Sequence, residues 1–366
     1  NFHEFAFGLT YKDGFFYATL ATAILPGGAS ADPQIPDRGK VAKINPQNGS
    51  VAFIASGLRT PNGIGFGVDG EMFIADNQGD WLPSSKIVHV KQGAFYGSRS
   101  VDFAGTANTP VMQPVVWLPQ DEIGNSPSQP LPLAAGPYKG QMMHGEVTHG
   151  GLKRVFVEKI EDEYQGVVFR FIQGLEAGVN RSILGADGKY YVGGIGNPGN
   201  WGQTGKLWYG LQRLTYNGKS AFEMLAVRAK SNGMEIEFTE PLGVNDGFDP
   251  SEYLIQQWWY KPTIEYGGPK MDLQTMKVSR VAVSEDRKKV FLEIPGLKPQ
   301  HVVYIRLMQP WVSQKGNSLW STEAWYTLNR IPQNTPGFAA SAVAEIRKPN
   351  TLTSAEKTAG WQLLFD

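Results

Sequence analysis

The 366-residue sequence contains no cysteine. This absence excludes a disulfide framework, a zinc site with thiolate ligands, a thiol nucleophile and a haem attached through a Cys-x-x-Cys-His motif within the chain. An excess of charge of one sign is also missing, because 34 Lys and Arg residues balance 34 Asp and Glu residues. No overall field therefore attracts nucleic acid or an anionic membrane surface, and nucleic acid is not an expected partner. No apolar run approaches the length of a membrane span.

Turn-forming and aromatic residues are plentiful instead, with 43 glycines, 24 prolines and 12% aromatic residues. This composition favours a turn-rich all-β protein. One pattern recurs three times, in which an Asp-Gly pair follows apolar residues and precedes an alternating aromatic run: Asp13-Gly14, Asp69-Gly70 and Asp187-Gly188. Because Asp-Gly readily adopts the positive φ angles of tight hairpin turns, each copy predicts two antiparallel strands.

The spacing of the three hairpins predicts the fold. Gly14 and Gly70 are 56 residues apart, and Gly70 and Gly188 are 118 residues apart, which is twice 59. An unmarked fourth copy therefore fits between the last two. A repeat of this length, with short strands and glycine turns, is typical of β-propeller blades. The third blade is predicted to open at residues 115–117 and to be interrupted by the proline-rich segment 127–137.

Three regions follow one another along the chain. Residues 1–224 are predicted to form about four blades, and residues 225–331 a small β-sandwich of the immunoglobulin or fibronectin type. Residues 332–366 are predicted to be a linker and the start of a further domain. Since four blades leave a ring open, we expect the missing blades to come from an upstream segment or another chain. The sequence starts without Met inside a blade, so we expect a fragment or a processed product.

Candidate ligand-binding residues should recur at equivalent positions, because propellers bind ligands at one end of the central channel. His3, Arg59 and Arg181 lie near the start of the innermost strands predicted for blades one, two and four, and Lys153 is the corresponding candidate in blade three. One histidine and three cations around a channel would suit an anionic, planar molecule. A metal site at His144 and His149, and structural roles for all these side chains, stay open as alternatives.

The sequence around Arg59 resembles a known family. The resemblance rests on the run 58–66 (Leu-Arg-Thr-Pro-Asn-Gly-Ile-Gly-Phe), the loop Asn77-Gln78-Gly79-Asp80, and the run 87–97 that ends Gly-Ala-Phe-Tyr-Gly. Similar motifs occur in the same order in the soluble quinoprotein glucose/sorbosone dehydrogenases, and the similarity covers about residues 1–216. It implies an all-β fold in which a partial six-bladed β-propeller precedes the sandwich.

The resemblance also implies roles for particular residues. His3 matches the base that takes the sugar hydroxyl proton while hydride passes to pyrroloquinoline quinone (PQQ). The residues that match PQQ contacts are Arg59, Thr60, Lys153 and Arg181, and those that match a Ca²⁺-binding loop are Gln78, Gly79 and Asp80. The implied protein is a periplasmic or extracellular PQQ-dependent sugar oxidoreductase, with a sugar as substrate and a cytochrome c as candidate electron acceptor.

Three features keep a non-catalytic alternative open. Thr60 stands where the family has Asn, and Asp80 where it has Pro. Residues 352–366, which end Trp-Gln-Leu-Leu-Phe-Asp, resemble the opening of a 3-keto-disaccharide hydrolase domain. The sequences of residues 1–9 and 77–83 resemble those of propellers in large, secreted, multidomain bacterial proteins. The alternative is therefore a carbohydrate- or protein-binding propeller scaffold attached to a 3-keto-glycoside hydrolase domain.

Overall fold

The computed structural model describes residues 3–196, 205–339 and 342. Their regular structure consists almost entirely of strands, β1 to β23, arranged in antiparallel sheets. The exceptions are a single turn of helix and three short 3-10 segments: α1 (Phe103–Thr106), η1 (Val68–Gly70), η2 (Gly136–Tyr138) and η3 (Pro250–Glu252). None of the helices in this part of the chain is long and apolar enough to cross a membrane. The predicted all-β fold is confirmed.

Blades one and two are four-stranded antiparallel sheets in which neighbouring strands are consecutive in the sequence. Blade one comprises β1 (Ala6–Lys12), β2 (Phe15–Leu20), β3 (Lys40–Ile44) and β4 (Val51–Ala55). Blade two comprises β5 (Ile64–Phe66), β6 (Met72–Asp76), β7 (Ser85–His89) and β8 (Val116–Leu118). Asp13, Gly14, Asp69 and Gly70 all have positive φ, as the hairpin prediction requires.

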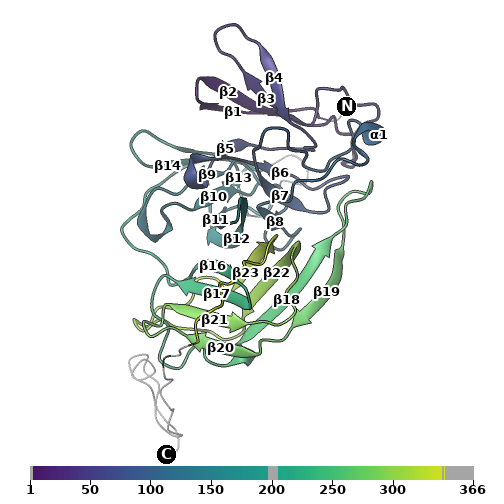
Figure 1. Cartoon of the computed structure of the whole chain (residues 1–366). Helices are drawn as coiled ribbons and strands as arrows, with labels where there is room; N and C mark the ends of the chain where they lie inside the picture. The colour runs from purple at the N-terminus through teal and green to yellow at the C-terminus, as the bar shows by residue number, and fades with distance from the viewer. Residues whose placement is uncertain (1–2, 197–204, 340–341, 343–366) are drawn as a thin grey trace, which may run out of the picture.

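Blades three and four continue this arrangement (Figure 1). Blade three comprises β9 (Leu131–Pro132), β10 (Met142–Gly145), β11 (Leu152–Ile160) and β12 (Glu163–Ile172). Blade four has three strands in the described residues: β13 (Gly178–Leu184), β14 (Tyr190–Ile195) and β15 (Tyr209–Leu214). These four antiparallel meanders are arranged as propeller blades, and the strands of blade three are part of a larger sheet.

The prediction that residues 115–117 open blade three is wrong. Val116 lies opposite Ile87, and Trp117 opposite Lys86, so this segment is β8, the outer strand of blade two. The pairing buries Val116 in the apolar core between blades two and three, where it meets residues such as Val155 and Val168. Burial in that core is the physical reason for the assignment.

The sandwich consists of two sheets. One has the order β16 (Met224–Lys230), β17 (Gly233–Phe238), β21 (Lys289–Glu293), β20 (Arg280–Val283). The other has the order β19 (Lys270–Met276), β18 (Tyr253–Tyr260), β22 (His301–Leu307), β23 (Glu323–Leu328). Alternate residues of β22 face opposite ways: Val303 and Ile305 join the core between the sheets, whereas Val302 and Tyr304 pack toward the blades.

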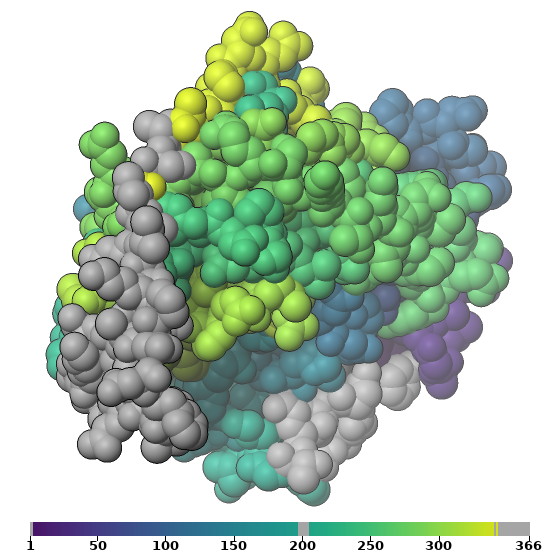
Figure 2. All heavy atoms as spheres, turned by 90° about the horizontal axis from the view of Figure 1, so that it is seen from below, coloured from purple at the N-terminus to yellow at the C-terminus, as the bar shows by residue number. Residues whose placement is uncertain are grey.

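The second sheet of the sandwich continues into blade three. β23 pairs with β12, with Gly166 opposite Thr327 and Val168 opposite Trp325, so the eight strands from β19 to β9 form one sheet. Figure 1 shows this continuity in the middle of the molecule, and Figure 2 shows the green sandwich spread across the lower face with blade residues at its margin. The predicted division at 224/225 stays a prediction, and most of the predicted 332–366 region, including the hydrolase-like tail, lies outside the described residues.

Candidate functional site

Arg59 lies between β4 and β5, where blades one and two meet. Its backbone N–H and that of Thr60 both donate to the carboxylate of Asp76 at the end of β6, over 3.2 and 2.9 Å. Burial raises the pKa of Asp76 to about 6, while the nearby Lys86 ammonium and these hydrogen bonds act in the opposite direction. Asp76 therefore fixes the main chain that carries two of the predicted cofactor contacts.

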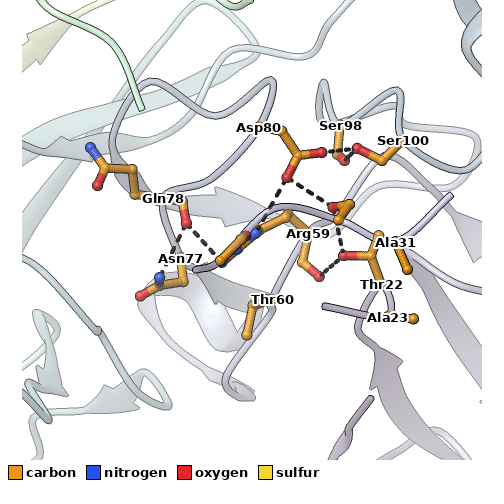
Figure 3. Close-up of polar contacts among 12 residues, drawn as sticks. Thr22, Ala23, Ala31, Arg59, Thr60, Asn77, Gln78, Asp80, Ser98 and Ser100 are labelled. Carbon is orange, nitrogen blue, oxygen red and sulfur yellow. Dashed lines mark hydrogen bonds and ion pairs between the residues drawn. The ribbon is translucent and has the colours of Figure 1, made fainter. Parts of the chain in front are cut away.

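The guanidinium of Arg59 is buried, and both of its terminal nitrogens donate to main-chain carbonyls, whereas Nε has no hydrogen-bond partner among the described residues. Nη1 donates to the Gln78 carbonyl oxygen over 2.8 Å, and Nη2 donates to the Gly28 carbonyl oxygen. The ring of Tyr266, in the sandwich, lies 5.1 Å from the guanidinium carbon. Figure 3 shows Arg59 held between the Gln78 carbonyl and Asp80. Arg59 thus ties together the 77–80 loop, the insertion after β2 and the sandwich.

Asp80 completes this network. Its carboxylate accepts hydrogen bonds from the hydroxyl of Ser30, over 2.8 Å, and from the hydroxyl of Ser100, and lies 3.8 Å from Arg59 Nε. Figure 3 shows Arg59 on one side of this carboxylate and Ser100 on the other. Gly79 allows the approach, since a Cβ at that position would lie 2.1 Å from Arg59 Nε. Three segments of blades one and two are therefore joined through a single carboxylate.

The predicted Ca²⁺ loop does not fit a cation in this arrangement. The Gln78 carbonyl accepts from Arg59, the Gly79 carbonyl accepts from the Gly267 N–H over 2.9 Å, and the Asp80 oxygens accept from serine hydroxyls. The Gln78 side chain donates to the Pro83 carbonyl over 2.9 Å. These oxygens face N–H and O–H donors, whereas Ca²⁺ needs six or more of them to face the ion. The described residues also contain no cluster of three or more His, Asp or Glu side chains that suits a metal.

His3 lies beside Ile24, with which it exchanges two backbone hydrogen bonds of 3.3 and 2.9 Å. Its ring centroid is 5.1 Å from that of Phe5. Burial, followed by the charge of Arg59, lowers the pKa of His3 below its usual value, so its imidazole is neutral at pH 7. The charge of Arg59 therefore acts on the His3 imidazole, and the predicted role of His3 as a catalytic base stays a prediction.

Arg181 lies on β13, the innermost strand of blade four. Its Nη1 donates to the side-chain oxygen of Asn62 and to the Asn180 carbonyl, each over 2.7 Å, and its guanidinium lies 5.5 Å from the Phe7 ring on β1. Asn62 Nδ2 donates in turn to Asn180 Oδ1 over 3.1 Å. Arg181 therefore joins β13 of blade four to β1 of blade one and to the loop that precedes β5 of blade two. Asn62 is not among the predicted site residues, although it lies within the motif that contains Arg59.

Lys153 is not where the sequence predicted. It lies on β11, the third strand of blade three, because β9 is the innermost strand of that sheet. Its ammonium is buried and donates to the Gly150 carbonyl over 3.2 Å, and burial lowers its pKa to about 8 against the opposing charge of Glu146. Opposite it in the sheet is His144, whose pKa burial lowers to about 4. Lys153 therefore belongs to a buried polar cluster within blade three.

The paired-histidine alternative is not supported by the geometry. His144 is buried and faces its neighbour's carbonyl, at 2.9 Å from Gly145 O. His149 is exposed and interacts with Asp121 at 3.1 Å. Each imidazole thus has its own partner, and no cluster of three ligands forms around them in the residues that the structure describes.

The predicted site is thus only partly assembled. His3 interacts with Arg59, and Arg181 joins Asn62, three residues after Arg59, but Lys153 belongs to a different cluster. Arg59 and Lys153 are both buried and donate to main-chain carbonyls. A quinone with several carboxylates would need those N–H groups directed at the ligand. The residues present therefore do not fit PQQ in this arrangement, and the quinone site remains a prediction from the resemblance.

Comparisons with known proteins give matches in structure only. No family model matches the sequence, and no curated protein matches it. A putative glucose dehydrogenase from Thermus thermophilus is 16% identical, with a TM-score of 0.38 over 55% of this chain and 61% of that chain. The PQQ-bound aldose sugar dehydrogenase from Streptomyces coelicolor is 17% identical, with a TM-score of 0.38 over 54% of this chain and 57% of that chain. The apo aldose sugar dehydrogenase from Escherichia coli is 14% identical, with a TM-score of 0.38 over 52% of this chain and 61% of that chain. The chain thus spans about three fifths of the length of these structures, and the matches cover about half of this chain.

Proposed function

We propose that this chain is a non-catalytic binding scaffold, in which four blades fused to a sandwich offer two uncovered apolar sheet faces to further β-blades. The observation that carries the proposal is that blades one and four each have one face buried against a neighbouring blade and one apolar face turned to solvent. Exposed apolar faces of this kind mark protein interaction sites.

The uncovered face of blade one has a row of apolar residues that crosses all four strands. Tyr11 lies opposite Phe16, Phe16 opposite Ile44, and Ile44 opposite Val51. Directly opposed residues share one face of a sheet, so this row forms a continuous apolar strip. Val51 is 52% exposed. The other face of blade one, which carries Tyr17 and Val41, is buried against blade two.

Blade four likewise has one buried face and one face open to solvent. Tyr190 and Val192 lie on the face that packs in one apolar core with residues of blade three. Tyr191, Gly193 and Ile195 alternate with them and point to the other face, where their strand partners include Ile183, Leu211 and Tyr209. Leu211 is 77% exposed, and Ile183 and Tyr209 are also exposed. Blade four therefore also has one apolar face open to solvent.

Equivalent residues of the blade repeat indicate what packs against the open face of blade four. Tyr17, Phe73 and Tyr191 are each the third residue after the glycine of an Asp-Gly turn. Tyr17 and Phe73 are buried because the next blade covers them, whereas Tyr191 is only half-buried. The open face of blade four is thus equivalent to faces that another blade covers in this chain. Further blades, from an upstream segment or another chain of a periplasmic or secreted protein, are the proposed occupants.

Leu211→Glu and Val51→Glu test this proposal, with Ile264→Glu, at an exposed residue of the sandwich, as matched control. The isolated chain should associate with increasing concentration, because two apolar faces lack their cover, and should bind an apolar fluorescent dye. Light scattering should show less association for the two face variants and no change for the control. A chain that stays monomeric without binding dye, or a control that acts as strongly as the face variants, would contradict the proposal.

The sugar oxidoreductase implied by the family resemblance is a second candidate, although the residues around Arg59 do not fit PQQ in this arrangement. The observation in its favour is that the His3 imidazole is neutral, as a base for sugar oxidation must be. Its test is reconstitution of the chain with Ca²⁺ and PQQ, followed by quinone absorbance and by sugar-dependent dye reduction. His3→Ala should abolish turnover without loss of folding if this candidate is correct. Absence of quinone binding rejects it, together with cytochrome c as electron acceptor.

A further inference from the structure

Blade four is one strand shorter than the other blades in the part of the chain that the structure describes. Blades one, two and three each have four strands, with β4, β8 and β12 in the fourth position. Blade four ends with its third strand, β15, and the chain after Leu214 leads into β16 of the sandwich. The outer edge of β15 is therefore the outer edge of the whole blade.

The outer edges of the other three blades are covered. In blade three, β12 pairs with β23. In blade one, the Gly93 N–H donates to the Ile54 carbonyl of β4 over 2.7 Å. In blade two, the Trp117 N–H of β8 donates to the Thr327 hydroxyl over 2.7 Å. Among the described residues, by contrast, no strand and no hydrogen-bonding group covers the outer edge of β15.

The main-chain groups of β15 point alternately to β14 and to this free edge. Tyr209 lies opposite the last residue of β14, and the next residue, Gly196, donates its N–H to the Trp208 carbonyl over 2.9 Å. In an antiparallel ladder with this bond, the N–H and C=O groups of Tyr209, Leu211 and Arg213 point away from β14. Tyr209 and Leu211 are 75% and 77% exposed. The edge therefore offers a row of main-chain donors and acceptors, which is what a further strand binds.

The blade repeat indicates which kind of strand fits this edge. Leu211 is equivalent to Val41 of blade one and Ile87 of blade two, because each lies opposite the residue two positions after the aromatic residue of the repeat. In these two blades the fourth strand is antiparallel, and it places Ala55 opposite the first of them and Val116 opposite the second. An equivalent strand beside β15 would be antiparallel and would have a small apolar residue opposite Leu211.

We infer that the outer edge of β15 binds an extended strand of the polypeptide that supplies the further blades. This strand pairs antiparallel with β15, exchanges main-chain hydrogen bonds with Tyr209, Leu211 and Arg213, and carries a small apolar residue opposite Leu211. The inference rests on the proposed function and adds how the partner is attached. In strand addition, the main-chain hydrogen bonds provide affinity and the alternate side chains provide specificity.

A synthetic peptide with the sequence of residues 49–57, which is β4 with two flanking residues on each side, is the probe for this edge. Fluorescence anisotropy of the labelled peptide, titrated with the full chain, should show saturable binding. Arg213→Pro removes one N–H from the free edge but none from the ladder with β14, and proline is tolerated at such positions. It should weaken binding about tenfold. Arg213→Gln loses the charge but keeps the N–H, so this matched control should bind normally.

Two further measurements test the register and keep the test decisive if Arg213→Pro does not fold, as judged by circular dichroism. Ala55→Glu in the peptide places a carboxylate opposite Leu211 and should weaken binding. Hydrogen exchange of the unsubstituted chain needs no variant. The bound peptide should slow exchange of the Leu211 amide but not of the Gln212 amide, which already faces β14.

Binding that Arg213→Pro weakens, or slower exchange of the Leu211 amide in the presence of peptide, supports the inference. Absence of saturable binding overturns it, as does binding that neither Arg213→Pro nor the peptide substitution changes. If Arg213→Pro reduces light scattering of the chain without peptide, a second copy occupies the edge and the inference is wrong.

The proposed function is tested separately, because Arg213→Pro replaces no apolar residue of the open faces. A chain that binds the apolar dye but not the peptide contradicts only the inference. A chain that binds the peptide but neither binds the dye nor associates contradicts only the proposed function.

Discussion

Arg154 of blade three donates a 2.9 Å hydrogen bond to Glu223 of the segment that leads into the sandwich, and both side chains are buried. Arg154 also donates to the Met224 and Leu225 carbonyls. Its replacement by Met leaves the Glu223 carboxylate buried without its cation, which costs about 3 to 5 kcal/mol. Arg154→Met should therefore lower the free energy of unfolding by this amount in urea titrations.

Arg330→Met is the control for this prediction. Arg330 also pairs with two glutamates, but its side chain is exposed, so its loss should lower the free energy of unfolding far less than the loss of Arg154. Equal losses for the two variants would show that the buried pair does not hold blade three to the sandwich.

His144 predicts how stability depends on pH. Burial lowers its pKa from 6.5 to about 4 in the folded protein, so between these pH values the unfolded chain binds more protons. The free energy of unfolding should therefore fall as the pH decreases from 6.5 to 4, with a contribution of about 3 kcal/mol from His144. His144→Phe should have a shallower pH dependence in this window. Asp76, whose raised pKa acts in the opposite direction, is present in both proteins and cancels in their difference.

Gly79→Ala tests the close contact between the 77–80 loop and Arg59. The added Cβ would lie 2.1 Å from Arg59 Nε and must displace a buried guanidinium, which should cost about 1 to 3 kcal/mol. Gly193→Ala is the matched control, because the nearest atom to its Cβ would be the Arg181 carbonyl oxygen at 3.7 Å. Thermal unfolding should show a lower midpoint only for Gly79→Ala, and an unchanged midpoint would refute the packing argument.

Calcium should leave the midpoint of thermal unfolding unchanged, because the oxygens of Gln78, Gly79 and Asp80 already accept hydrogen bonds from protein donors. An ion that binds only the folded state raises its stability by an amount that grows with the logarithm of the ion concentration above the dissociation constant, so the comparison of millimolar Ca²⁺ with chelator is sensitive to a site. Stabilisation by Ca²⁺ that disappears in Asp80→Ala would restore the metal site predicted from the sequence.

The parts of the fold that depend on neighbouring residues were predictable. Asp13-Gly14 and Asp69-Gly70 specify their hairpins through their own φ angles, and those hairpins set the positions of the blades. The strand at residues 116–118 was assigned to the wrong blade because its partner β7 lies about thirty residues earlier, and period-2 alternation does not identify a partner.

The contacts of the candidate site could not be predicted either, because they too join residues that are distant in the sequence. The sequence placed Arg59 at a blade boundary, but its contacts with Gly28 and Tyr266 depend on segments 31 and 207 residues away. The local sequence around Arg59 is the same whether its side chain binds a ligand or holds protein segments together. Lys153 was assigned to an innermost strand because β9 is only two residues long and leaves almost no pattern in the sequence. The free outer edge of β15 is likewise defined only after distant strands have paired.

The β12–β23 pairing restricts how the molecule can move. A sandwich attached by a tether would rotate against the propeller, and a cavity between them would open and close. Here Gly166 and Thr327 belong to adjacent strands of one ladder, so rotation would require main-chain hydrogen bonds to break. The blades and the sandwich therefore keep a fixed arrangement, and a partner or ligand that contacts both meets a surface that is formed before it arrives.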